Sequence, residues 1–126
     1  MDKNNNIVIL FAEDDEQIRY ITSEMLKSEG YTVLAAENGE LAYNLGLRHL
    51  QEIDILLTDL HMHKTKGGDL IELLLADRPD LKILISSGYI KNVKEKIVIQ
   101  DREIPFLIKP YTRQALMKEL DKLLNS

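Results

Sequence analysis

The chain has 126 residues, of which 44% are hydrophobic and 29% charged, a composition typical of one globular domain with a single core. It contains no cysteine, which excludes disulfides, zinc–thiolate sites and iron–sulfur clusters. Its net charge of −5 argues against nonspecific nucleic-acid binding, and no apolar run approaches the roughly 20 residues that span a bilayer. We expect one cytoplasmic domain over residues 1–126, with no nucleic-acid or membrane partner and a flexible segment over residues 1–5.

Short apolar runs predict the β-strands. Four of them are continuous and rich in leucine or β-branched residues, which is typical of strands covered on both faces of a parallel sheet. These four runs are residues 7–12, 53–58, 81–86 and 104–108, and a weaker fifth run covers residues 31–36.

The segments between and after the strands carry apolar residues at helical spacing. We predict a first helix ended by Gly30, a second capped by Asn38, a third ended before Pro79, a poor fourth over residues 90–99 and a fifth capped by Thr112. The predicted apolar positions are Ile18, Ile21, Met25, Leu26, Leu41, Leu45, Leu50, Leu70, Leu73, Leu74, Leu116, Leu120 and Leu123.

The order of elements is therefore a strand followed by a helix, repeated five times. This alternation predicts an α/β fold, a doubly wound (βα)5 arrangement with a five-stranded parallel sheet and helices on both faces. Functional sites in such sheets lie at the carboxyl ends of the strands, near the topological switch point.

Polar residues collect at that edge of the predicted sheet. They are Glu13 and Asp14 after the first strand, Asp59 after the third, Ser86 and Ser87 at the fourth, and Lys109 after the fifth. Three converging carboxylates favour Mg²⁺, which prefers oxygen ligands and pairs with phosphate. The lysine suits a phosphate oxygen and a serine hydroxyl adds one hydrogen bond. The set indicates phosphoryl transfer, in which a carboxylate can itself be the nucleophile.

Four motifs together resemble the receiver domain of two-component response regulators over the whole chain. They are "FAEDD", "TDLHM" followed by Gly67, "ISSGY" and "FLIKP". The resemblance implies a CheY-like, flavodoxin-like fold with strand order 2-1-3-4-5. It also implies a signalling switch rather than an enzyme, one that takes a phosphoryl group from the phosphohistidine of a sensor histidine kinase or a histidine phosphotransfer protein. The downstream effector is not specified by the sequence.

The resemblance implies a role for each residue of the phosphorylation site. Asp59 is expected to be the phosphoacceptor, Ser87 the switch hydroxyl, and Lys109 the partner of the carboxylate or phosphate. Phe106 is expected to be the switch aromatic, although an ordinary core phenylalanine explains it equally well. The Lys109–Pro110 peptide is expected to be cis.

The resemblance also implies the metal ligands. Mg²⁺, with Mn²⁺ as a substitute, is expected on Asp14 and Asp59 directly, on Glu13 mostly through water, and on the backbone carbonyl of His61. Asp14 is chosen as the second acid because receivers place their first core helix residue four positions beyond it, followed by arginine, here Ile18–Arg19.

Neighbouring residues allow other interpretations. Asp15 and Glu16 fall near a helix start, where the dipole favours negative charge. Ser86 is the rival of Ser87, and strand alternation points the two to opposite faces, so only one can serve. The family places its hydroxyl just before a small residue, here Gly88, which selects Ser87.

The loop after the phosphoacceptor departs from the family pattern. His63 stands where proline is usual, which predicts a more mobile loop. Residues 61–63, two histidines and a methionine, leave a transition-metal site as a minor alternative. His61 and Tyr89 occupy the positions that tune aspartyl-phosphate lifetime in the family.

Two other functions stay open. A Mg²⁺-dependent phosphohydrolase of the haloacid dehalogenase type would use similar groups, but it needs an acid where this chain has His61. A receiver-shaped interaction module that is never phosphorylated would not need the intact set of site residues. For assembly, we expect a monomer or a weak homodimer through the face formed by the fourth helix, fifth strand and fifth helix.

Overall fold

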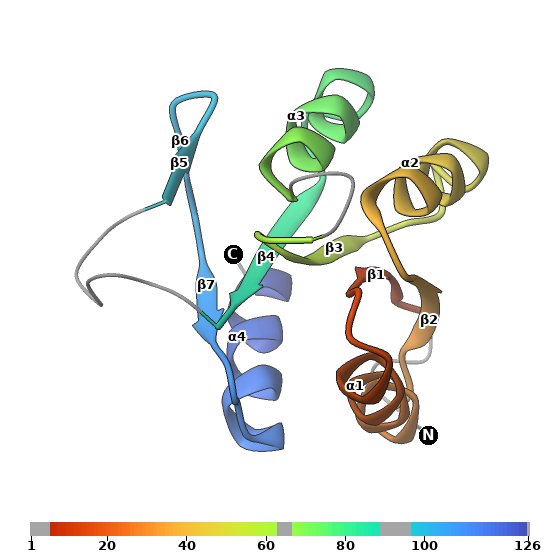
Figure 1. Cartoon of the computed structure of the whole chain (residues 1–126). Helices are drawn as coiled ribbons and strands as arrows, with labels where there is room; N and C mark the ends of the chain where they lie inside the picture. Colours follow the sequence, from red (N-terminus) through yellow and green to blue (C-terminus); the bar gives the residue numbers. More distant parts are fainter. Residues whose placement is uncertain (1–5, 63–66, 89–96, 126) are drawn as a thin grey trace.

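The structure, a computed structural model, describes residues 6–62, 67–88 and 97–125. Its centre is a parallel sheet of β1 (Val8–Ala12), β2 (Thr32–Ala36), β3 (Ile55–Asp59), β4 (Lys82–Ser87) and β7 (Phe106–Ile108). The strand order is β2-β1-β3-β4-β7 (Figure 1). This confirms the predicted order 2-1-3-4-5, with β7 as the fifth parallel strand.

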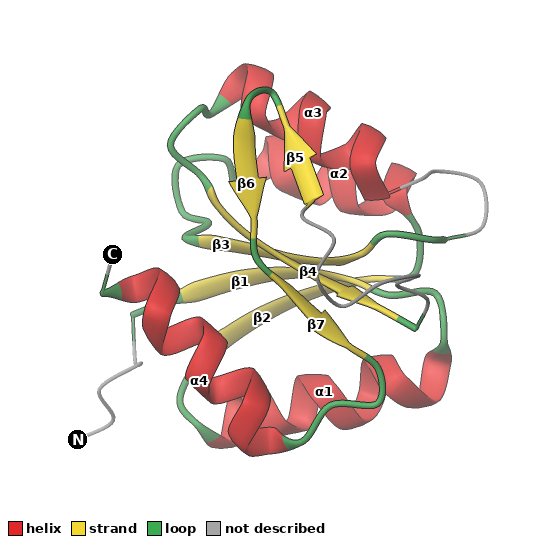
Figure 2. Cartoon of the chain, turned by 90° about the vertical axis from the view of Figure 1, so that its left-hand side faces the viewer, coloured by secondary structure: helices red, strands yellow, loops and turns green. Residues whose placement is uncertain are grey.

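The helices cover both faces of this sheet. They are α1 (Glu16–Ser28), α2 (Gly39–Arg48), α3 (Gly67–Asp77) and α4 (Arg113–Leu124). α1 and α4 lie on one face and α2 and α3 on the other (Figure 2). Within the described residues, none of these helices has the length and apolar character needed to cross a membrane.

The helix boundaries follow from local chemistry. The Asn38 side chain accepts a hydrogen bond from the Leu41 amide at 2.8 Å, and the Thr112 hydroxyl accepts one from the Ala115 amide at 3.0 Å. Gly30 follows α1 with a φ of 96°, a conformation that glycine adopts without steric cost. Both predicted caps and the predicted end of α1 are confirmed.

The predicted fourth helix is wrong over residues 97–99. β5 (Ile97–Ile99) pairs antiparallel with β6 (Arg102–Ile104) in a separate two-stranded sheet. The three residues of β5 are all β-branched, which favours a strand over a helix. Gln100 and Asp101, with φ of 54° and 62°, form the tight turn whose two central residues both need positive φ.

This hairpin interrupts the predicted alternation of strands and helices. Four helices flank the sheet in the described part of the chain, and residues 89–96 lie outside it. The predicted strand over residues 104–108 is divided at Pro105, because β6 ends before the proline and β7 begins after it. The face predicted for a homodimer therefore carries β5 where the end of its fourth helix was expected.

The sheet separates two buried layers. The layer under α2 and α3 contains Leu10, Leu56, Leu70, Leu74, Ile83 and Ile85. The layer under α1 and α4 contains Ile9, Phe11, Leu26, Leu57, Leu84, Leu116 and Leu120. Neighbouring residues of one strand enter different layers because side chains alternate along a strand.

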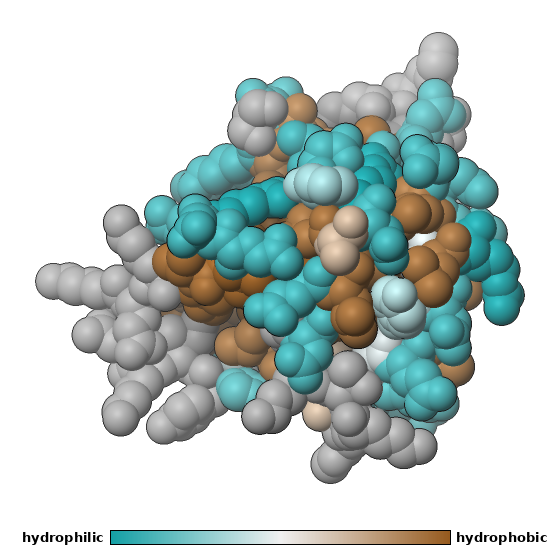
Figure 3. All heavy atoms as spheres, turned by 90° about the horizontal axis from the view of Figure 1, so that it is seen from above, coloured by the Kyte–Doolittle hydropathy of each residue, from teal (hydrophilic) through white to brown (hydrophobic). Residues whose placement is uncertain are grey.

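Three predicted apolar positions are exposed instead of buried. Ile21 on α1 is 54% exposed, Leu73 on α3 is 46% exposed and Leu41 on α2 is 43% exposed. α1 buries Thr22, Ser23 and Leu26. Seen from above, apolar side chains on the outer surface lie in patches separated by polar ones (Figure 3). The inward face of α1 is thus more polar than its apolar spacing predicts.

Candidate phosphoacceptor site

Three carboxylates meet at the carboxyl edge of the sheet. Glu13 follows β1, Asp59 ends β3, and the pairing of Ala12 with Thr58 brings these two strand ends side by side. Glu13, Asp14 and Asp59 each offer a carboxylate oxygen, and these oxygens lie within 4.8 Å of one another. Glu13 is 1% exposed and Asp59 is 6% exposed, so their charges are poorly solvated.

Lys109 bridges two of these carboxylates. Its Nζ donates a hydrogen bond to Asp59 Oδ2 at 2.8 Å and a second one to Glu13 Oε1. Its backbone amide donates to the Ser87 carbonyl at 2.8 Å, which fixes the end of β7 against β4. The ammonium group therefore lies where groups from three strands converge.

Burial and charge act in opposite directions on this ion pair. Burial raises the pKa of Glu13 and outweighs the hydrogen bond from Lys109, which lowers it. Burial is also the largest single effect on Lys109 and lowers its pKa, but the hydrogen bonds and charges of Asp59 and Glu13 together raise it. The lysine stays protonated at neutral pH, and one ammonium faces three carboxyl groups.

The loop between β1 and α1 fixes the acidic pair. Asp15 caps α1, since its Oδ1 accepts from the Ile18 amide at 3.0 Å. Arg19 Nη1 donates to the Glu13 carbonyl at 2.9 Å and to the Asp14 carbonyl at 3.5 Å. Asp15 thus has the helix-start role predicted for it. The contacts of Arg19 were not predicted, although the residue itself marked the position of the second acid.

The residues after Asp59 are only partly described. The His61 amide donates to Asp59 Oδ1 at 3.1 Å, which places its backbone beside the carboxylate. His63 lies outside the described residues. The only cluster of metal-ligating side chains in the described ranges is the three-carboxylate group, and it contains no histidine. The arrangement therefore fits a hard cation better than a transition metal.

The two serines of β4 occupy opposite faces of the sheet. Ser86 is in register with Asp59 and shares its face, toward α1 and α4. Ser87 is in register with Ile108 and faces α2 and α3, as Phe106 does. Both serines are fully buried, and Ser86 Oγ has no hydrogen-bond partner in the described part of the structure. The Lys109–Pro110 peptide is cis.

An apolar groove adjoins the site on the α1 side. It has a volume of about 360 Å³ and is lined by Ile18, Ile21, Thr22, Met25, Lys109, Pro110 and Tyr111. This groove was not predicted from the sequence, because Ile21 was expected to be a buried core residue. The exposure of an isoleucine beside Lys109 is the structural signal that reveals it.

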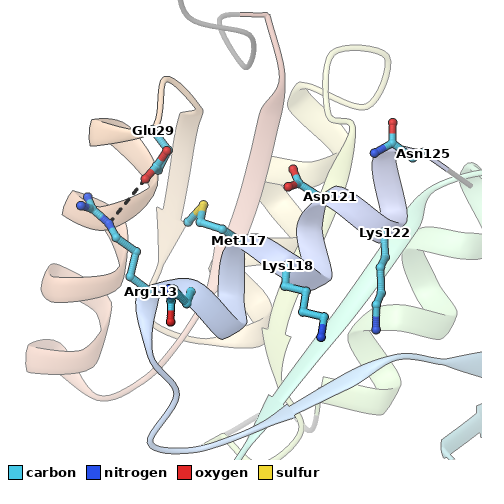
Figure 4. Close-up of a pocket in the computed structure, with 8 residues that line it drawn as sticks. Glu29, Arg113, Met117, Lys118, Asp121, Lys122 and Asn125 are labelled. Atoms are coloured by element: carbon cyan, nitrogen blue, oxygen red, sulfur yellow. Dashed lines mark ion pairs between the residues drawn. The ribbon is translucent and has the colours of Figure 1, made fainter.

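A second groove has a different character. It runs along α4 and the end of α1, and charged residues of both signs, including Glu29, Arg113 and Lys118, line it (Figure 4). Arg113 Nε lies 3.6 Å from Glu29 Oε1, and both side chains are partly exposed. No residue predicted for the phosphoacceptor site lines this groove.

Comparison with known proteins identifies the family. The model of the response regulator receiver domain matches residues 9–121. The response regulator receiver protein CpdR of Brucella abortus is 33% identical over 92% of this chain and 95% of its own length. The sensor kinase CckA of the same species is 28% identical over 98% of this chain, which spans only 13% of that kinase.

A solved structure has the same fold. The receiver domain of the sensor histidine kinase PA1611 from Pseudomonas aeruginosa, solved with a magnesium ion in its active-site cleft, superposes with a TM-score of 0.82. The two chains are 23% identical, and the match covers 96% of this chain and 99% of the other. The matches favour neither the phosphohydrolase nor the unphosphorylated module. The chain therefore belongs to the family of response regulator receiver domains of two-component signal transduction.

Proposed function

We propose that Asp59 of this receiver domain accepts a phosphoryl group from a phosphohistidine and thereby switches the domain between two conformations. The observation that supports this best is the 2.8 Å contact between Lys109 Nζ and Asp59 Oδ2, inside a cluster of three carboxylates. This geometry gives one carboxylate oxygen a neighbouring cation and leaves a concentration of negative charge suited to a divalent ion.

The chemistry assigned to Asp59 is nucleophilic. Its carboxylate oxygen forms a bond to phosphorus while the bond from phosphorus to the donor imidazole nitrogen breaks, and that nitrogen keeps the electron pair. Lys109 can then turn from Asp59 to a phosphoryl oxygen without leaving the site, because Glu13 still holds its ammonium group. The domain acts as a switch that is phosphorylated and later dephosphorylated, not as an enzyme that releases a product.

The donor set fits Mg²⁺. Glu13, Asp14 and Asp59, with the backbone carbonyl of His61, would hold the ion, and Mn²⁺ would substitute for it. When bound, the ion supplies charge neutralisation for phosphoryl transfer. Its presence in the cleft of the similar PA1611 receiver supports this assignment.

The proposed readout involves the opposite face of β4. Ser87 would hydrogen-bond the phosphoryl group, and Phe106, which shares its face, would follow. The changed surface around β7 and α4 would bind an effector or a second copy in a weak dimer. The proposed donor also indicates a location. A histidine kinase takes its phosphoryl group from ATP, which is a cytoplasmic substrate, so this single receiver domain would act in the cytoplasm.

The apolar groove supports a protein as the donor. Ile21 is 54% exposed beside Lys109, at the edge of the site, and an exposed apolar groove indicates a contact surface. We expect Ile21→Glu to slow transfer from a phosphohistidine protein by about tenfold or more, on the scale of one interface anchor. Transfer from a small donor such as acetyl phosphate should not change. Tyr20→Glu, next to it on α1 but outside the groove, is the matched control.

Phosphorylation of Asp59 is tested directly with a small donor. Incubation of the protein with acetyl phosphate and Mg²⁺ should add one phosphoryl group by intact mass, and Asp59→Asn should abolish the addition. Asp54→Asn is the control, because Asp54 precedes the same strand but its Oδ2 accepts from the Val8 amide at 2.8 Å, outside the carboxylate cluster. Equal labelling of Asp59→Asn and the parent would refute the proposal.

A further inference from the structure

Lys109 can act only if its ammonium group is held in place. A lysine side chain has a flexible four-carbon stem, and ordering it costs about 2 kcal/mol of rotamer entropy. The backbone before it is fixed by the hydrogen bond from the Lys109 amide to the Ser87 carbonyl, 2.8 Å long. The backbone after it leaves the sheet, so another contact has to fix the loop toward α4.

Tyr111 makes that contact. Its hydroxyl lies 2.9 Å from Thr22 Oγ1 on α1, and the two residues are 89 positions apart in the chain. Thr22 is 2% exposed, so one partner of this hydrogen bond is buried, and hydrogen bonds are stronger in a buried environment.

The Tyr111 hydroxyl is also close to the charges of the site. Burial raises the pKa of Tyr111, and Lys109, Glu13 and Asp59 each act on it electrostatically. Its contact with Thr22, which is buried, directs the hydroxyl toward α1.

α1 connects this hydrogen bond to the acidic pair. Arg19, one turn before Thr22 on the helix, holds the carbonyls of Glu13 and Asp14. One rigid helix thus carries an attachment for the acidic loop and an attachment for the lysine loop. The relative position of Glu13 and Lys109 depends on both attachments.

We propose that the hydrogen bond between Thr22 and Tyr111 positions Lys109, so that Tyr111 is a positioning residue of the phosphoacceptor site. This inference rests on the proposed function, because Lys109 needs its position only if it pairs with a phosphoryl group on Asp59. Tyr111 would act through the loop and would touch neither the metal nor the phosphoryl group.

The same loop and helix offer a matched control. Arg113 pairs with Glu29 at 3.6 Å (Figure 4), and it also donates to Ser28 Oγ. The Arg113 side chain is 50% exposed, and exposed pairs of this kind contribute little. Arg113→Gln removes a link between α4 and α1 without touching the hydrogen bond between Thr22 and Tyr111.

The test compares two affinities, each measured by titration calorimetry. The first is the affinity for Mg²⁺, and the second is the affinity for the phosphoryl mimic beryllofluoride in saturating Mg²⁺. Tyr111→Phe and Thr22→Val should each weaken beryllofluoride binding on the order of fivefold, the scale of one hydrogen bond. The double variant should be no weaker than either single one, and Thr22→Ser should restore binding. Mg²⁺ affinity should stay within about twofold, because carboxylates and not Lys109 hold the metal.

The outcomes separate this inference from the proposed function. Unchanged beryllofluoride affinity in both single variants, or an equal loss of Mg²⁺ and beryllofluoride affinity, would overturn the positioning role. A loss in Arg113→Gln as large as that in Tyr111→Phe would overturn it too, because any link to α1 would then serve. A parent protein that binds Mg²⁺ but not beryllofluoride would refute the proposed function itself.

Discussion

The two faces of the sheet differ in what they bury. Under α2 and α3 the core is dominated by leucine and isoleucine, and the Thr58 hydroxyl there donates to the Asp59 carbonyl at 3.0 Å. Under α1 and α4 the core also contains Ser23, Tyr31 and Ser86, whose hydroxyls have no hydrogen-bond partner among the described residues. Asp59 and its ion pair with Lys109 lie on this second side, since the register places Ser86 and Asp59 on one face.

This difference shows that one layer mainly stabilises the fold and the other holds the functional site. An unpartnered buried hydroxyl costs about 1–3 kcal/mol, so the layer under α1 and α4 is the less favourable one. It is also the layer that holds the charged site, its positioning contacts and the apolar groove. The layer under α2 and α3 offsets that cost through close packing, as at Gly46, where a Cβ would lie 2.7 Å from Leu74 Cδ2.

The largest effect is expected from a cavity in the apolar layer. Leu74 is fully buried, and Leu74→Ala should lower the free energy of unfolding by about 3 kcal/mol through lost burial and an unfilled cavity. The beryllofluoride affinity of the folded protein should not change. Leu73→Ala, at the neighbouring 46% exposed position, should cost less than about 1 kcal/mol. Urea denaturation measures both, and similar losses in the two variants would contradict the layered picture.

Mg²⁺ bound at the site in the other layer should stabilise the folded chain by an amount comparable to the loss expected for Leu74→Ala. A ligand present at about 100 times its dissociation constant adds about 2.7 kcal/mol to the free energy of unfolding. We expect Mg²⁺ to raise the thermal midpoint of the parent and to have little effect on Asp14→Asn. Asp15→Asn should respond like the parent, because Asp15 only caps α1 and asparagine caps equally well. A full Mg²⁺ response in Asp14→Asn would remove Asp14 from the ligands.

Tyr31 should make the stability of the second layer depend on high pH. Burial, with Asp121 and Glu29 adding to it, raises the pKa of Tyr31 from 10.0 to about 12. Between these values the folded chain binds a proton that the unfolded chain has lost, so the free energy of unfolding falls as pH rises. Between pH 10 and 12, this effect should lower the free energy of unfolding by about 2 kcal/mol.

Tyr31→Phe isolates this contribution from the other groups that titrate at high pH. The variant should remove about that much of the fall between pH 10 and 12. At pH 7 the free energy of unfolding should be unchanged or slightly higher, because the hydroxyl that the variant lacks has no hydrogen-bond partner among the described residues. Tyr20→Phe, 67% exposed, should follow the parent curve. Identical pH curves for Tyr31→Phe and the parent would show that Tyr31 ionises normally in the folded chain.

The convergence of the site residues was predictable from sequence for a physical reason, whereas the strand order was implied by the family resemblance. Parallel strands end at one edge, so the polar residues after each apolar run had to meet there. The positions of the apolar runs were therefore enough to identify Glu13, Asp59 and Lys109. The Thr22–Tyr111 hydrogen bond was not predictable in this way, because two residues 89 positions apart leave no local pattern.

The errors came from applying regular patterns where local chemistry differed. The alternation of strands and helices suggested a helix over residues 90–99, although the β-branched run 97–99 already favoured a strand. Apolar spacing placed Ile21 in the core, whereas α1 turns Thr22 and Ser23 inward. Two adjacent hydroxyl residues in the middle of a helix were the available signal that its inner face is polar.

The smallest expected effect distinguishes the two serines of β4. Ser86→Ala removes a buried hydroxyl without a partner, so it should raise the free energy of unfolding by about 1 kcal/mol. It should leave the conformational response to beryllofluoride unchanged, as followed by amide NMR shifts around β7. Ser87→Ala should weaken beryllofluoride binding by no more than about fivefold, the scale of one hydrogen bond. It should reduce the conformational response, because Ser87 shares a face with Phe106. The opposite result would assign the switch to Ser86 and place it in the same layer as Asp59.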